Sequence, residues 1–366
     1  MRAASDEQHS GQDGSHRASI LRAMQLLTRD LPGTGGLHKA SPDDFIVDEL
    51  PAYPPSGEGS HTFLRIEKRA LTTAEAVARL ARALGAKQNE AGTAGQKDRQ
   101  ALTRQWISLP EVDPARALET TVDGVRVLEA ARHGHKLRTG HLHGNRFTLT
   151  LRGVVPDGLA RARAIIDRLV QHGLANYFGQ QRFGARGDNA ARGKQLLSPT
   201  KSGPRINPNE RRMLISAYQS ELFNRYLDAR MSDALVDQPL VGDVLKKTDS
   251  GGLFTVDDTP AALDDARGRL AARAVVVTGP MVGHKMMSPP PGTPSRARED
   301  ALLVAEGLDA ESFKVLGRLA EGTRRPLLVP IGDATVRAGD TPDAIVLELT
   351  LPPGAYATVL LAEVTK

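Results

Sequence analysis

Alternation of hydrophobic and polar residues predicts β-strands in the first half of the chain. The clearest case lies at 145–152, where Phe147, Leu149 and Leu151 alternate with arginine and threonine. A period of two gives a strand one apolar and one polar face. Other strand-like runs lie at 44–50, 61–67, 104–109, 126–131, 274–278, 326–331, 344–349 and 357–364.

Helical spacing appears at three places. Thr72 or Thr73 can cap a helix that continues to Gly85, with Glu75 completing a capping box. Apolar residues also recur at helical spacing over 159–172 and 210–229. Long alternation of strand and helix is absent from the first half, which argues against a doubly wound parallel sheet. We therefore expect an α+β fold with a mostly antiparallel sheet flanked by helices.

The length of 366 residues favours about two domains, because a single core rarely grows beyond roughly 250–300 residues. Residues 1–17 are polar without periodicity and predict a disordered extension. The composition changes near 174, and strand-like runs return near the end of the chain. We predict one domain from 18–173 and 321–366, with a second α+β domain inserted over 174–320.

Composition narrows the class of protein. Hydrophobic residues make up 40% and charged residues 25%, as in ordinary globular proteins. The absence of cysteine excludes disulfides, cysteine-ligated zinc, iron–sulfur clusters and a cysteine nucleophile. The N-terminal residues are polar and no apolar run approaches the roughly 20 residues that span a bilayer. We expect a soluble, cytoplasmic protein without membrane contact.

Positive charge is concentrated in two blocks. Residues 182–212 contain eight basic and two acidic residues, a net charge of +6 that exceeds the +5 of the whole chain. Residues 130–156 contain no carboxylate and carry five lysines or arginines and four histidines. Such blocks are either solvated faces or contacts to the phosphates of a nucleic acid.

The segment Ala94-Gly95-Gln96-Lys97-Asp98-Arg99 places one carboxylate between two cations. Neighbouring positive charge lowers the pKa of Asp98 and keeps it ionised at neutral pH. Such an anion can stabilise an oxocarbenium ion or attack an anomeric carbon. The alternative is an ordinary turn with two surface ion pairs.

Four histidines, His133, His135, His141 and His143, form two His-x-His pairs. On strands each pair would point one way and could bind a metal ion. No cysteine or carboxylate accompanies them, which makes a catalytic zinc site improbable. We interpret them as part of a basic face.

Asn145 and Phe147 share one face of the predicted strand. A ring and an amide so placed can stack on a flipped base and hydrogen-bond to its edge. Phe147 taken alone is equally explained as a core residue. The Gly-rich phosphate-binding motifs of dinucleotide and triphosphate sites are absent.

Taken together, the order and spacing of a series of short segments resemble the tRNA pseudouridine synthase D family over nearly the full chain. The matching segments are Lys39 with Asp44-Phe45-Ile46-Val47, Gly57-Glu58-Gly59 with His61, Ala94 to Arg99 with Thr103 and Gln105, Lys136-Leu137-Arg138, Gly144-Asn145-Arg146-Phe147, Asn176-Tyr177-Phe178-Gly179, Gln181-Arg182-Phe183-Gly184, Ser216-Ala217 with Leu222-Phe223-Asn224, Gly322-Thr323-Arg324-Arg325-Pro326, and Leu351-Pro352 with Gly354 and Tyr356-Ala357-Thr358.

This resemblance implies a pseudouridine-synthase-type fold whose catalytic sheet is built from both ends of the chain. It implies isomerisation of uridine to pseudouridine in tRNA, typically at position 13, without metal or cofactor. Asp98 corresponds to the catalytic aspartate, and Asn145 and Phe147 to residues beside the flipped uracil. Further substrate-binding residues are expected at Lys39, Lys97, Arg99, Arg182 and Arg324. We expect a monomer with tRNA as its partner and no obligatory protein partner.

Some positions depart from the family pattern, and two rival functions stay open. Leu349 stands where an aromatic residue is common and Ala362 where an arginine is common, which questions contacts from the C-terminal segment. A non-catalytic RNA-binding protein or RNA chaperone would use the same basic surface. A metal-dependent RNA hydrolase would use the histidine pairs.

Overall fold

The computed structural model describes residues 24–197 and 206–366 and divides into two compact units. The sheet unit comprises Asp30–Gly173, Pro330–Ala357 and Glu363–Lys366. The inserted unit comprises the described residues of 24–29, 174–329 and 358–362. The predicted extension at 1–17 lies outside the described residues.

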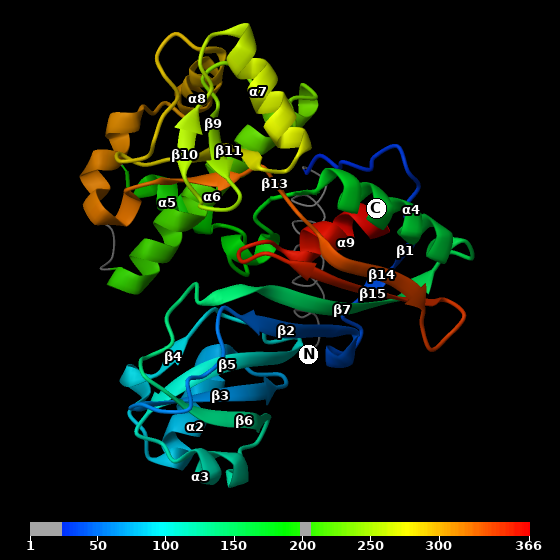
Figure 1. Cartoon of the computed structure of the whole chain (residues 1–366), viewed down its shortest axis with the longest axis vertical. Helices are drawn as coiled ribbons and strands as arrows, with labels where there is room; N and C mark the ends of the chain where they lie inside the picture. Colours follow the sequence, from blue (N-terminus) through cyan, green and yellow to red (C-terminus); the bar gives the residue numbers. More distant parts are fainter. Residues whose placement is uncertain (1–23, 198–205) are drawn as a thin grey trace, which may run out of the picture. The chain divides into compact units, whose positions relative to one another are not determined.

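A nine-stranded sheet forms the centre of the sheet unit, in the order β14-β15-β7-β2-β5-β3-β6, with β1 beside β7 and β4 beside β5 (Figure 1). The strands are β1 (Gly35–His38), β2 (Phe45–Pro51), β3 (His61–Lys68), β4 (Gly92–Thr93), β5 (Leu102–Pro110), β6 (Val125–His133), β7 (Leu142–Val154), β14 (Gly332–Ala338) and β15 (Ala344–Leu351). β2 and β5 are parallel, and every other pair of neighbouring strands in the described chain is antiparallel. The predicted α+β class with a mostly antiparallel sheet is confirmed.

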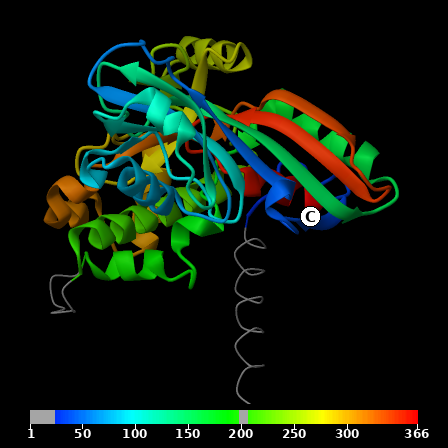
Figure 2. The ribbon, with the colours of Figure 1, turned by 90° about the horizontal axis from the view of Figure 1, so that it is seen from below.

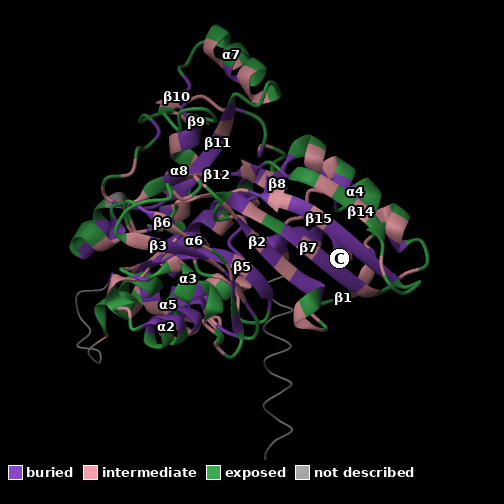
Figure 3. Ribbon diagram, turned by 60° about the horizontal axis from the view of Figure 1, so that its bottom comes forward, coloured by how far each residue is buried: buried purple, intermediate pink, exposed green. Residues whose placement is uncertain are grey.

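Strand β7 follows the alternation read from the sequence. It lies between β2 and β15, and Phe147 is opposite Val47 on one side and Leu349 on the other. Figure 2 shows β7, β14 and β15 running side by side as long twisted strands. Most residues of β3, β5 and β15 are buried, and buried positions alternate with partly exposed ones along β2 (Figure 3). The two ends of the chain therefore contribute neighbouring strands to one sheet.

Helix α2 (Thr73–Leu84) begins and ends as its sequence predicts. The Thr72 side chain accepts from the Glu75 amide, and the Thr72 amide donates to the Glu75 carboxylate. Gly85 ends the helix with a positive φ of 70°, which glycine adopts without a Cβ clash. The apolar face of α2 packs on β3, β5 and β6 in one buried cluster. The remaining helices of this unit are α3 (Pro114–Glu119) and α4 (Gly158–His172).

The inserted unit has its own four-stranded sheet in the order β10-β9-β11-β12, and a two-stranded pair of β8 and β13. Its elements are β8 (Leu174–Ala175), α5 (Asn189–Gln195), α6 (Pro208–Ser232), β9 (Val244–Lys247), β10 (Leu253–Thr255), α7 (Pro260–Ala271), β11 (Val275–Met281), α8 (Pro294–Ala305), β12 (Thr323–Pro326) and β13 (Leu328–Val329). Because β12 and β13 pair within this unit, its central stretch runs from 174 to 329, past the predicted boundary at 320. The single strand predicted at 326–331 is instead divided between these two short strands.

The C-terminal run at 357–364 was predicted as a strand, and this prediction is wrong. The segment is helix α9 (Ala357–Thr365). Val359, Leu360, Leu361 and Val364 are all buried. A short run that is apolar on nearly every side has no period of two or 3.6, so pattern alone does not separate a buried helix from a buried strand.

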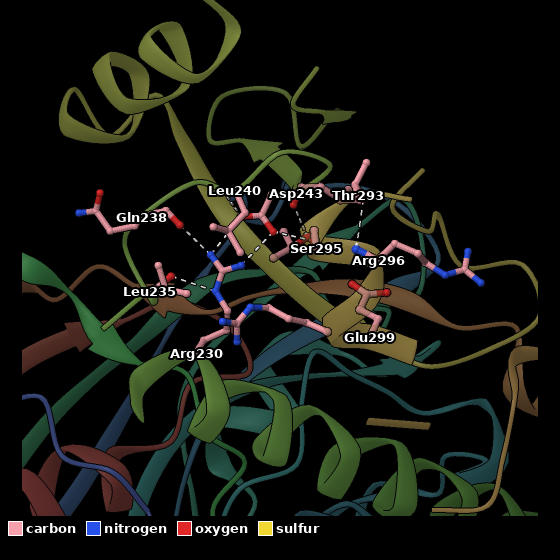
Figure 4. Close-up of polar contacts among 12 residues, drawn as sticks. Arg230, Leu235, Gln238, Leu240, Asp243, Thr293, Ser295, Arg296 and Glu299 are labelled. Carbon is pink, nitrogen blue, oxygen red and sulfur yellow. Dashed lines mark hydrogen bonds and ion pairs between the residues drawn. The ribbon is translucent and has the colours of Figure 1, made fainter. Parts of the chain in front are cut away.

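A buried ion pair lies in the interior of the inserted unit. Arg230 of α6 forms two hydrogen bonds to Asp243, at 2.9 and 3.0 Å, with both side chains at most 1% exposed (Figure 4). Ser295 and the Leu240 amide also donate to Asp243. Charges removed from water need such complete pairing, because an unpaired buried charge is strongly destabilising.

We predict that Arg230→Met lowers the free energy of unfolding by about 3–5 kcal/mol, because it leaves the Asp243 carboxylate buried without its counter-ion. Urea unfolding followed by circular dichroism measures the loss. The matched control is Arg267→Met, which removes an exposed arginine paired with Asp264 and should change stability little. Equal, small losses in both variants would contradict a structural role for the buried pair.

Candidate active site

The loop that contains Asp98 connects β4 to β5. Strand β4 pairs with β5, so the chain turns back over residues 94–101 before it enters the sheet at Leu102. Strand β5 is then parallel to β2, with Thr103 opposite Val47. The register places this loop at the end of the two parallel strands.

The carboxylate of Asp98 is held by two donors. Lys39 Nζ lies 2.5 Å from Oδ2, and the Gln100 amide donates to Oδ1 at 3.0 Å. Burial works against ionisation, but these hydrogen bonds and the charges of Lys39 and Lys68 outweigh it and lower the pKa of Asp98 below its ordinary value. The side chain remains 32% exposed. Asp98 is therefore an accessible, ionised carboxylate at neutral pH.

Three consecutive residues of this loop are attached to the turn between β3 and α2. The Lys97 amide donates to Thr73 Oγ1 at 2.9 Å. The carbonyl oxygen of Asp98 accepts from Lys68 Nζ at 2.9 Å. Arg99 Nε donates to the Ala70 carbonyl at 3.2 Å. We call segment 68–73 the anchoring turn, because it fixes the loop on both sides of Asp98.

The side chain of Lys97 points into the protein. Its ammonium lies 2.7 Å from Glu49 Oε2, and the two side chains are 7% and 0% exposed. Glu49 Oε1 also accepts from the Trp106 amide at 3.0 Å. Lys97 was predicted to bind substrate, whereas the structure gives it a buried carboxylate partner.

Asn145 and Phe147 lie on β7 opposite Glu49 and Val47 of β2. The registers of β7, β2 and β5 place them on the same sheet face as Thr103. The amide oxygen of Asn145 is buried, and the described residues provide no hydrogen-bond partner for it. A buried acceptor left without a partner is a candidate for binding a donor from a ligand.

Phe147 is 6% exposed and meets Phe45 edge to face, with ring centroids 6.2 Å apart. Lys39 Nζ lies 4.3 Å from the centroid of the Phe45 ring, a cation–π contact. Contacts therefore lead from Asp98 through Lys39 and Phe45 to Phe147. The structure brings together four of the predicted residues, Asp98, Lys39, Asn145 and Phe147, on one side of the sheet unit.

Two other predicted arginines differ in exposure and partners. Arg99 is 62% exposed and lies 3.9 Å from Glu75. Arg182 belongs to the inserted unit, where it hydrogen-bonds to the hydroxyls of Ser216 and Ser220 and lies over the Phe178 ring.

Arg324, also in the inserted unit, is buried. Its side chain is 1% exposed and pairs with Glu299 at 2.7 Å. It also donates to the hydroxyl and carbonyl of Thr278 and to the carbonyl of Met287. These contacts occupy the guanidinium inside the unit, and substrate binding by Arg324 stays a prediction.

Three of the four histidines gather around one tyrosine on the sheet unit. The Tyr53 ring stacks on His133 with centroids 5.3 Å apart and meets His135 and His141 edge-on. The Tyr53 hydroxyl lies 2.5 Å from His141 Nδ1. His143, the fourth histidine, is exposed on β7. The cluster fastens the loop after β2 to the segment between β6 and β7.

This cluster is poorly arranged for a metal ion. The Ser56 amide donates to His133 Nδ1, which leaves the proton of neutral His133 on Nε2, the atom that faces His135 at 3.2 Å. No group of three histidine, aspartate or glutamate side chains in residues 24–197 and 206–366 is placed to hold a metal. The geometry of the donors themselves argues against the hydrolase alternative.

Sequence reasoning missed Glu49 and Lys68, although both carried a signal. Each continues the apolar face of its strand, Glu49 after Phe45 and Val47, and Lys68 after Ile66. A charge at an inward position of a strand needs a buried partner. Such a break in alternation marks a polar site inside the fold.

The fold agrees with that of a solved structure from Methanosarcina mazei assigned to tRNA pseudouridine synthase D. The TM-score is 0.75, with 23% sequence identity, 95% of this chain covered and 97% of the other. At this level of identity, the likeness shows that the two proteins share a fold.

Sequence comparison identifies the family. The model of tRNA pseudouridine synthase D (TruD) matches residues 22–202 and 198–364. A tRNA pseudouridine synthase D from Anaeromyxobacter dehalogenans is 46% identical over 94% of this chain and 96% of its own length. One from Thermus thermophilus is 42% identical over 93% of this chain and 92% of its own. The chain belongs to the tRNA pseudouridine synthase D family.

We predict that Lys39→Met raises the pKa of Asp98, because it removes a hydrogen bond and a charge that favour the carboxylate. Carbon-13 NMR of aspartate-labelled protein measures the titration, with the Asp98 signal assigned by its loss in Asp98→Asn. Lys87→Met, which removes an exposed lysine paired with Glu90, should leave the midpoint unchanged. An unchanged midpoint in Lys39→Met as well would show that Lys39 does not set the ionisation of Asp98.

Proposed function

We propose that this protein isomerises uridine to pseudouridine in tRNA, at position 13, with Asp98 as the catalytic residue. Family membership supports the reaction. The observation that supports the residue is the Asp98 carboxylate, which is accessible yet kept ionised by Lys39 and the Gln100 amide. A carboxylate prepared in this way can act on the C1′ centre of a nucleotide.

The reaction exchanges one glycosidic bond for another. The bond from N1 to C1′ breaks, the uracil turns while it is held, and a bond from C5 to C1′ forms. N1 gains a proton and C5 loses one, so no atoms or electrons enter or leave overall and no cofactor is required. Asp98 either attacks C1′ to form a covalent adduct or removes a ribose proton to give a glycal.

The freed uracil must be held without water, which would divert a glycosyl intermediate to hydrolysis. Phe147 offers a ring on the sheet face beside Phe45. The free acceptor of Asn145 suits the N3–H of uracil. Because cytosine has no proton on N3, this acceptor would also favour uracil over cytosine.

Exposed positive charge supports the choice of an RNA substrate. Arg99 flanks Asp98 on the sheet unit. On the inserted unit, Arg186, Arg211 and Arg212 are exposed in the basic block, whereas Lys201 and Arg205 of that block lie outside the described residues. We assign the sheet unit to catalysis and the inserted unit to gripping tRNA phosphates through shape and charge.

One chain supplies every residue of the proposed catalytic group, which supports a monomer without an obligatory protein partner. The tRNA substrate supports a cytoplasmic location. In the described residues no helix is long and apolar enough to cross a membrane.

Asp98→Asn should abolish turnover, because the amide can neither attack C1′ nor remove a proton. Release of tritium from tRNA labelled at uridine C5 measures turnover, and filter binding measures affinity, each with and without a chelator. We expect affinity within a few fold of wild type. Binding by the wild type without tritium release would favour the RNA-binding alternative, and release that the chelator stops would favour metal-dependent chemistry.

Phe147→Leu should weaken base binding in the transition state by about 1–3 kcal/mol, because leucine keeps apolar volume but has no ring to stack. The measurement is kcat/KM for tritium release. Phe63→Leu is the control, since Phe63 is equally buried but lies on the opposite face of the sheet. Equal losses of stability with unchanged kcat/KM in both variants would identify Phe147 as a core residue only.

A further inference from the structure

Lys68 is a fully buried lysine at the end of β3. Its ammonium donates to two backbone carbonyls, that of Leu71 at 2.7 Å and that of Asp98 at 2.9 Å. The first bond closes the anchoring turn on itself. The second joins this turn to the peptide that carries the proposed catalytic carboxylate.

Within the described part of the chain, the charge of Lys68 has no direct counter-ion. Among the ion pairs of the described residues, none includes Lys68. Carbonyl dipoles alone replace its hydration, and a buried ammonium without a carboxylate is costly. The apolar face formed by Leu64 and Ile66 would accept a methionine at this position more easily. We therefore attribute the presence of lysine at this position to a function of its positive charge.

We propose that Lys68 is a positioning residue of the isomerisation: its buried ammonium fixes the Asp98 peptide to the anchoring turn and supplies positive charge that favours the Asp98 carboxylate. The proposal rests on the proposed function. Lys68 touches only the main chain of Asp98, so it acts through that residue and does not contact the substrate.

Three charged groups act on Lys68. Asp98 and Lys97 belong to the loop above it, and Glu75 belongs to the first turn of α2. Burial lowers the pKa of Lys68 to about 8. The negative charge of Asp98 opposes this shift, and the positive charge of Lys97 adds to it. Lys68 is therefore positively charged at neutral pH and loses its proton as the pH rises through about 8.

Loss of the Lys68 proton should change activity and stability in opposite directions. In the unfolded chain lysine keeps its proton to about pH 10.4. Between pH 8 and 10 the unfolded state therefore binds the extra proton, and the contribution of Lys68 to stability rises with pH. Turnover that depends on the ammonium should fall over the same interval while the protein stays folded.

The first experiment measures single-turnover pseudouridine formation between pH 6.5 and 9.5, together with tRNA affinity and thermal unfolding. Lys68→Met should lower the rate by about 10²-fold through displacement of the carboxylate. Its affinity should stay within about 3-fold, and the alkaline decline near pH 8 should vanish. Lys87→Met, an exposed lysine of the same unit, should behave as wild type. An unchanged rate with the same alkaline decline in Lys68→Met would overturn the proposal.

A second variant uses the absence of cysteine from the chain. Lys68→Cys can be alkylated with 2-bromoethylamine in denaturant and refolded, which places a lysine analogue with a more acidic amine at this one position. Wild type taken through the same steps is the control. We expect activity to return relative to Lys68→Cys, with an alkaline decline that begins at lower pH than in wild type. Recovery without that shift would assign the decline to another group, such as uracil N3, and overturn the role of the charge.

The outcomes also separate the two proposals. Wild-type protein that forms no pseudouridine would refute the proposed function. Active wild type whose turnover is indifferent to Lys68→Met would refute only the positioning role.

Discussion

The geometry of the site depends on one constraint, the attachment of the Asp98 loop to the anchoring turn. Thr73, Lys68 and Ala70 each contact one of three consecutive loop residues. The turn is itself rigid, because it continues from β3 and enters the capping box of α2. These contacts hold the Asp98 carboxylate in place although it lies on a connection between strands. Reaction at C1′ requires such placement, since small displacements of a reacting group cost large factors in rate.

Near this attachment, charged side chains lie in pairs on a mostly apolar face of the sheet. Glu49 on β2 neutralises Lys97 inside the fold, and Lys39 reaches the Asp98 carboxylate from the segment after β1. Each lysine thus has a separate acceptor, and the net effect is to favour the ionised form of Asp98. Beside these charges, Asn145 and Phe147 provide an acceptor and a ring on the same face. The parallel pairing of β5 with β2 places the Asp98 loop beside β2, which is the neighbour of β7.

The sequence predicts those elements of the fold whose structure is decided by nearby residues. The period of two in β7 and the capping box of α2 are local patterns, and both were confirmed. Burial of a charged side chain depends on distant partners, so the sequence does not show that Glu299 holds Arg324 inside the fold. Lys68 was overlooked for the same reason, since one of its two acceptors, the Asp98 carbonyl, lies in a loop 30 residues away. Helix α9 was misassigned because its apolar run has no decisive period.

The most direct test of this account is the rate of pseudouridine formation by Thr73→Val in a single turnover. This change removes the hydroxyl that accepts from the Lys97 amide and donates to Gln105 Oε1, and it leaves a side chain of nearly the same shape. The account predicts a rate at least about 10-fold below wild type, with tRNA affinity retained and faster hydrogen exchange at the amides of 97–100. A wild-type rate together with faster exchange would show that catalysis does not depend on the attachment of the loop.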